Sequence, residues 1–139
     1  MSEKTILVIG TYDTKSDELN YISDRITSMG GKVLTMDVSV LGEPKKETHF
    51  SKHTVAEAAG KSIKEAIDSG SEHIAMNIMS DGASKLANQL NQKNKFDGVI
   101  ILGGTMGTDL ALDVCQSLPL GLPKYVVSTV SFSPIIPSG

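Results

Sequence analysis

Short apolar runs alternate with longer amphipathic stretches along this 139-residue chain. Apolar residues between the runs recur at helical spacing, as Leu19, Ile22 and Ile26 do. The runs themselves are rich in β-branched residues and predict buried strands over residues 6–9, 32–40, 97–102 and 124–130. Strands that alternate with helices indicate βαβ crossovers and a mainly parallel sheet, here of four or five strands. We therefore expect an α/β fold, a Rossmann-like three-layer sandwich.

Glycines and capping residues set the expected helix boundaries. The first helix should begin at Ser16 and close at Gly30 and Gly31, a pair typical of a helix C-terminus. Thr54 stands three residues before Glu57, which is the spacing of a capping box, so a second helix is expected to begin there.

The middle of the chain allows two interpretations. The second helix should stop near Gly60 and resume over residues 62–68. Apolar residues in steps of four then predict a long helix over residues 71–92, although Gly82 weakens this pattern. The alternative makes residues 73–79 a further strand of the sheet.

Composition narrows the classes of protein. The chain is 40% hydrophobic and 21% charged, with a net charge of −3, which argues against a nucleic-acid or anionic-membrane surface. The single Cys115 excludes an intramolecular disulfide, and no apolar run approaches the roughly 20 residues that span a bilayer. We expect a cytoplasmic protein with one domain over residues 1–139. The Ser- and Pro-rich end after residue 130 is either a natural tail or a cut through a larger protein, and we favour the cut.

The first apolar run leads into a small-residue turn with candidate chemistry. Gly10 can take a positive φ and lets the chain leave the strand sharply. The hydroxyls of Thr11 and Thr14 lie near the next helix start, and Lys15 is a cation suited to phosphate. Asp13 would cap this helix, or orient a ribose hydroxyl or a metal ion. In the competing interpretation Asp13 and Thr14 only cap the helix, and Lys15 is solvated.

A second glycine-rich turn joins the third strand to a helix expected over residues 108–118. Its candidate ligand-binding residues are Gly103, Gly104, Thr105, Gly107 and Thr108. Small residues let the backbone approach a phosphate, and a helix N-terminus favours an anion. The turn contains neither a Walker A motif nor a strict G-x-G-x-x-G, and a tight turn without ligand is the alternative.

Further polar residues fall at the expected strand ends. Asp37 ends the second strand, where an acid often holds ribose hydroxyls, or it simply terminates that strand. Ser128 and Thr129 end the last strand. His49 and His53 are four residues apart but straddle a loop and a helix start, so we predict no metal site. If the first and third strands flank the switch point of the sheet, the two glycine turns meet there.

Four segments of the chain carry a resemblance to a known family. They are GTYDTKSDE at residues 10–18, DVS at 37–39, GVIILGGTMGT at 98–108 and LPLGLPKYVVSTV at 118–130. In their order and spacing these segments resemble the N-terminal domain of the tomato mosaic virus resistance protein and its bacterial and fungal relatives. The resemblance implies an ATP-binding, Rossmann-like domain, followed in the family by more of the same domain and a barrel-like second domain. It therefore implies that this chain is an N-terminal fragment of a longer two-domain protein. Met106 stands where the family has a glycine, and Thr105 where it has a serine.

Three hypotheses about function follow, and the sequence singles out no catalytic residue. The first is a nucleotide-binding domain for ATP, with or without Mg²⁺, in which the glycine turns hold the phosphates. The second is part of an enzyme that acts on a phosphorylated or carboxylate metabolite, with Asp13 or Asp37 as acid or base and a C-terminal domain completing the site. The third is a non-catalytic interaction domain. A missing downstream half would leave a sheet edge bare and favour a homo-oligomer.

Overall fold

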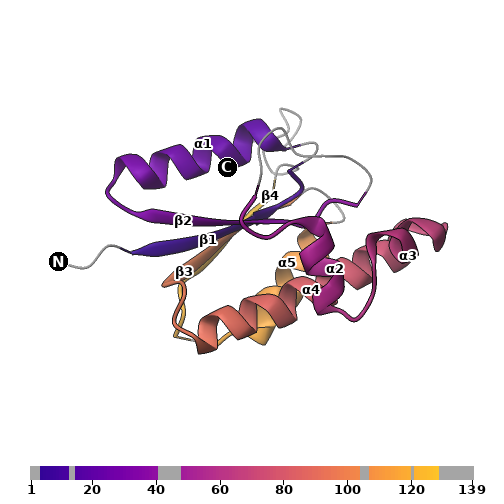
Figure 1. Ribbon diagram of the computed structural model, residues 1–139. Coiled ribbons are helices and arrows are strands. Elements are labelled where there is room, and N and C mark those ends of the chain that lie inside the picture. Colours follow the sequence, from indigo (N-terminus) through magenta and orange to yellow (C-terminus); the bar gives the residue numbers. More distant parts are fainter. Residues whose placement is uncertain (1–3, 13–14, 41–47, 104–106, 120, 129–139) are drawn as a thin grey trace, which may run out of the picture.

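The computed structural model describes residues 4–12, 15–40, 48–103, 107–119 and 121–128 (Figure 1). The strands are β1 (Thr5–Gly10), β2 (Lys32–Asp37), β3 (Gly98–Gly103) and β4 (Lys124–Ser128). The helices are α1 (Ser16–Ser28), α2 (Lys52–Ala58), α3 (Ile63–Asp68), α4 (Glu72–Gln92) and α5 (Gly107–Ser117). This succession confirms the α/β fold that the sequence pattern predicts.

The described strands form one parallel sheet in the order β2-β1-β3-β4. Gly10 at the end of β1 pairs with Asp37 of β2 on one side and with Leu102 of β3 on the other. Gly103 pairs in turn with Ser128. The carboxyl ends of all these strands therefore lie along one edge of the sheet.

Helices cover both faces of the sheet (Figure 1). On one face, α1 packs on β1 and β2, and Leu19 joins Val8 and Leu102 in a small core. On the other face, α2, α4 and α5 enclose a larger core that includes Leu7 and Ile9. The alternation of Leu7, Val8 and Ile9 between the two cores follows from the two-residue period of a strand.

Capping serines start the helices of the second layer. The Oγ of Ser51 accepts the backbone N–H of Thr54 at 3.2 Å, so α2 begins earlier than the predicted cap at Thr54. Ser62 caps α3 through the N–H of Glu65 at 3.1 Å. Gly60 lies between these helices at φ 76°, and Gly30 follows α1 at φ 90°, which confirms both expected breaks.

Residues 72–92 form the single helix α4, so the alternative strand at residues 73–79 is wrong. The glycine that weakened the helical pattern has a packing role. A Cβ added at Gly82 would overlap the backbone carbonyl of Val55, because α4 crosses α2 at this residue. The absence of a side chain is what lets the two helices approach so closely.

The second strand is shorter than predicted, because β2 ends at Asp37 rather than at residue 40. From there the outer edge of β2 is covered by residues 48–50. Phe50 forms an isolated parallel bridge with Met36, donating its N–H to Thr35 O and accepting that of Asp37, both at 2.9 Å. The imidazole Nδ1 of His49 accepts the backbone N–H of Thr35 at 3.1 Å. This edge of the sheet therefore has partners within the domain.

The remaining boundaries fall within a residue or two of the predicted ones. β3 begins at Gly98 and α5 at Gly107, and β4 is described up to Ser128. In the described ranges, no helix is both long and apolar enough to cross a bilayer.

Candidate functional site

The two predicted turns leave adjacent strands. β1 and β3 pair directly, and they lead to helices on opposite faces, α1 on one and α5 on the other. The helix starts at Ser16 and Gly107 therefore both follow the carboxyl edge of the sheet at its switch point. The prediction that the first and third strands flank this point is confirmed. Open α/β sheets bind ligands in the crevice at such a point.

Gly10 has a different role from the predicted one. It keeps an extended strand conformation and does not use the positive φ that is open to glycine. A Cβ at Gly10 would lie 2.7 Å from both methyl carbons of Leu19 and 3.2 Å from the carbonyl oxygen of Leu102. Gly10 is thus a glycine because α1 and β3 fill the space beside it.

The first turn passes directly into α1. The backbone N–H of Lys15 donates to Thr11 O at 2.9 Å, and Leu19 N–H donates to Lys15 O at the same distance. Lys15 occupies the N-cap position, is half-buried, and caps the helix with its backbone only. Among the residues that the structure describes, Lys15 forms no ion pair with Glu18, the partner that stands one turn away.

Asp37 ties the first turn to the end of β2. Its Oδ1 accepts the backbone N–H of Tyr12 at 3.2 Å and that of Ser39 at 2.9 Å, and its side chain is 1% exposed. A buried carboxylate needs such donors, since an isolated charge is costly to remove from water. The predicted ribose acceptor therefore already holds the backbone of the turn in position.

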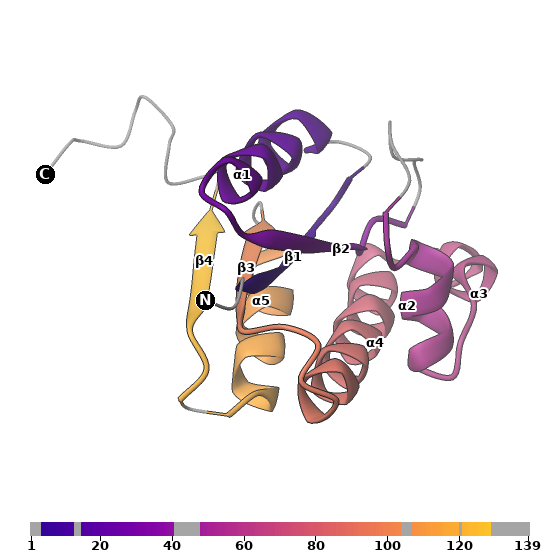
Figure 2. The same ribbon diagram turned by 60° about the vertical axis from the view of Figure 1, so that its left-hand side comes forward.

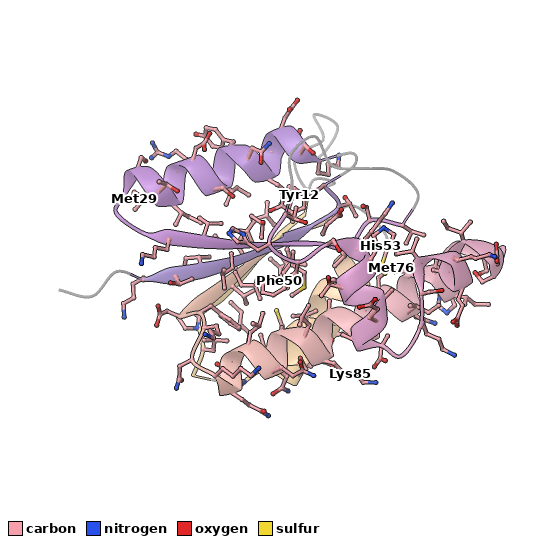
Figure 3. All side chains as sticks on the ribbon, in the orientation of Figure 1. Tyr12, Met29, Phe50, His53, Met76 and Lys85 are labelled. Atoms are coloured by element: carbon pink, nitrogen blue, oxygen red, sulfur yellow. The ribbon has the colours of Figure 1, made fainter. Side chains whose placement is uncertain are left out.

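Tyr12 is a site neighbour that the sequence pattern did not reveal. It lies between α1 and the sheet (Figure 3), where its ring packs with Val8, Leu19 and Leu102. Burial raises the pKa of the Tyr12 phenol, and the negative charge of Asp37 raises it further. The Tyr12 side chain, which packs between α1 and the sheet, therefore stays uncharged. The helical pattern of α1 does not reach Tyr12, because the helix begins at Ser16 and Tyr12 lies in the turn before it.

A buried lysine was also missed. Lys52 begins α2 and is only 4% exposed, with its Nζ 3.4 Å from the carbonyl oxygen of Val40. Fully buried lysines are rare. Nothing in the local sequence distinguishes Lys52 from the other lysines near it in the chain.

The structure places only the backbone of several predicted site residues. Gly103 and Ser128 end adjacent strands, and Gly107 and Thr108 form the first turn of α5. The other predicted residues lie outside the described ranges, namely Asp13, Thr14, Gly104, Thr105 and Thr129. Their binding roles remain predictions.

The structure places two of the histidines and the cysteine on separate elements. His49 covers the edge of β2, and His53 is exposed on α2 (Figure 3). Cys115 is half-buried against the larger core, and burial raises the pKa of its thiol. In the described part of the chain, no three His, Cys, Asp or Glu side chains gather as metal ligands.

Residues 4–137 match the model of the N-terminal domain of an uncharacterised protein family, UPF0261. The chain belongs to this family. A UPF0261 protein of Brucella suis is 54% identical over 132 residues, which are 95% of this chain and 32% of that protein. A Clostridium tetani member is 35% identical over 92% of this chain and 32% of its own length. The chain thus spans about a third of the length of these bacterial relatives.

The family extends to plants and the fold extends beyond the family. The tomato protein named ToMV resistance protein Tm-1 is 31% identical over 91% of this chain and 19% of its own length. Among solved structures, the C-terminal domain of a hydrogenase from Pyrococcus furiosus superposes with a TM-score of 0.64. That match covers 91% of this chain and 93% of the other at 19% identity, so it shows a shared fold.

Proposed function

We propose that this UPF0261 domain binds a nucleotide, with ATP as the first candidate, in the crevice between the carboxyl ends of β1 and β3. The observation that carries the proposal is the direct pairing of these strands, whose helices leave on opposite faces of the sheet. This topology favours a ligand at the switch point, and a glycine-rich helix start there favours a phosphate.

The residues at this edge suit a phosphate ester. Lys15 supplies a half-buried cation at the start of α1, while Gly107 and Thr108 begin α5. The glycine turn from Gly103 to Thr108 would hold the phosphates with backbone N–H groups, helped by the Thr105 and Thr108 hydroxyls. Thr11, Asp13 and Thr14 would complete the site from the first turn.

The ribose would lie toward β2, beside Asp37. Oδ1 of this carboxylate already accepts two backbone N–H groups. A ribose hydroxyl would therefore have to donate to Oδ2, which has no hydrogen-bond partner among the described residues. Such a bond would leave the Asp37 contacts with the turn intact.

Calorimetric titration with Mg-ATP tests the proposal. The unmodified chain should bind saturably, and Lys15→Ala should weaken binding about tenfold, the cost of one charge-assisted contact. Lys85→Ala is the matched control, because Lys85 lies on α4 away from this edge (Figure 3) and pairs with Asp81. A repeat with ATP and EDTA shows whether Mg²⁺ takes part.

Two results would contradict the proposal. Adenosine that binds as tightly as ATP would show that phosphate is not recognised. Equal losses of affinity for Lys15→Ala and Lys85→Ala would show that the contact is non-specific charge attraction.

A further inference from the structure

We propose that the β3–β4 surface on the α1 side of the sheet is the docking site of an amphipathic helix. The helix would come from the polypeptide that full-length family members carry beyond this N-terminal domain. We call this surface the open face and define it by Ile100, Tyr125 and Val127. The proposal is independent of nucleotide binding.

The open face follows from strand register. Ile100 pairs with Tyr125, and Leu102 pairs with Val127, so these side chains share one face of the sheet. Leu102 and Val127 pack in the same small core as Leu19 of α1, which identifies this face as the α1 side. Tyr125 is nevertheless 62% exposed, and Ile100 is only half-buried.

The two faces of the sheet carry unequal cover. On the face opposite the open face, α5 packs on both β3 and β4, α4 lies beside α5, and α2 lies beside α4. On the α1 side, the one described helix packs on β1 and β2, and β4 stands at the border of the sheet (Figure 2). Neighbouring strands are about 4.8 Å apart, so the two strands of the open face offer a width of about 10 Å, the diameter of one helix.

The occupant must be largely apolar where it touches the sheet. The open face consists of two aliphatic side chains and a tyrosine, with no charged group to pair. A helix with a single apolar stripe meets this requirement and leaves its polar side to solvent. Tyr125, at 62% exposed, is the side chain of the open face that such a helix would cover most, beside the half-buried Ile100.

The length of the relatives indicates where this helix comes from. The chain matches a family model described as an N-terminal domain, yet it spans only 32% of the Brucella suis relative. About two thirds of that protein therefore lies outside the matched region. A segment of the same polypeptide reaches the open face at a high effective concentration, which a separate partner does not.

Thiol labelling of one position on the open face tests the proposal. Tyr125→Cys and Tyr21→Cys are made in a Cys115→Ser background, and each is labelled with a maleimide. Tyr21 is the matched control, because it is a tyrosine of similar exposure (66%) on α1. In the full-length Brucella suis relative, the two positions that correspond to residues 125 and 21 are labelled in the same way after its native cysteines are replaced.

The proposal expects protection at one position only. The thiol at position 125 should react rapidly in the 139-residue chain. At the corresponding position of the full-length relative, the thiol should react at least about tenfold more slowly, because a packed side chain is shielded from the reagent. The thiol at position 21 should react equally fast in both proteins.

Three outcomes would overturn the proposal. Equally fast labelling at position 125 in both proteins would show that the extra polypeptide does not cover the open face. Protection in the 139-residue chain that grows with its concentration would show that a second copy covers it. Rapid labelling combined with slow amide exchange over residues 124–128 of the full-length protein would show an added strand at the β4 edge.

Discussion

The outer edges of β2 and β4 have opposite surroundings. At β2, the backbone groups of Thr35 and Asp37 that point away from the sheet are bonded to His49 and Phe50. At β4, no strand of the described residues pairs with the outer edge, and Tyr125 and Val126 are 62% and 42% exposed. Native proteins protect sheet edges because an unpaired edge invites association. The outer edge of β2 is therefore covered within this domain, whereas the outer edge of β4 has no strand partner among the described residues.

The two halves of the sheet differ in the same way. β1 and β2, which we call the finished half, lie between α1 and the larger core. β3 and β4, the less covered half, have helices on the α5 side and the open face on the other side. The switch point lies at the seam between these halves. A ligand there would contact the finished half through Lys15 and Asp37 and the less covered half through the turn after β3.

The largest expected effect comes from the crossing of α2 and α4 in the finished half. Gly82→Ala should lower the free energy of unfolding by about 3 kcal/mol or more, because the new methyl group overlaps the carbonyl of Val55 and the two helices must separate. Urea unfolding followed by circular dichroism measures the loss.

Gly121 provides the matched control for this substitution. It precedes β4, its φ is not positive, and a Cβ there meets no atom within 4 Å. Gly121→Ala should change the free energy of unfolding by less than about 0.5 kcal/mol. Similar losses for both substitutions would contradict the packing argument, since helix propensity alone favours alanine at position 82.

Gly82 shows what local sequence can and cannot predict. The apolar period correctly predicts α4, since steps of four residues build a helix face whatever lies opposite. The apolar period shows only that Gly82 has a low helix propensity. It does not show the contact with the backbone of Val55, which lies 27 residues earlier in the chain. Gly10 is misread for the same reason: its neighbours Leu19 and Leu102 are brought to it by tertiary packing.

The candidate site likewise has features that the sequence could predict and features that depend on tertiary packing. Its position was predictable, because parallel strands bring their carboxyl ends to one edge and the order of crossovers makes β1 and β3 neighbours. The bonds of Asp37 to Tyr12 and Ser39 were not, since they depend on where a turn folds back. The burial of Lys52 depends on α2 docking beside Val40, for which the sequence carries no period or motif.

A smaller effect tests how the finished half holds the first turn. Asp37→Ala should lower the free energy of unfolding by about 2 to 4 kcal/mol, because the buried N–H groups of Tyr12 and Ser39 lose their acceptor. Chemical denaturation measures the loss.

Asp97 is the matched control for Asp37, because its Oδ2 accepts a strand N–H, that of Thr5 at 2.8 Å, at an exposed position. Water can replace that acceptor, so Asp97→Ala should cost about 1 kcal/mol or less. An equal cost for the two substitutions would show that burial at Asp37 is not the decisive factor.

The smallest expected effect addresses the protected edge itself. His49→Ala removes the Nδ1 acceptor of the Thr35 N–H, but the exposed amide can turn to water, so the free energy of unfolding should fall by only about 0.5 to 1 kcal/mol. Amide exchange at Thr35 should accelerate, and the variant should self-associate more readily, because β2 then offers an unpaired donor at its edge. His53→Ala is the control on the exposed side of α2. Unchanged exchange at Thr35 would show that Phe50 alone protects this edge, and the contrast with β4 would then depend on the backbone bridge rather than on the histidine.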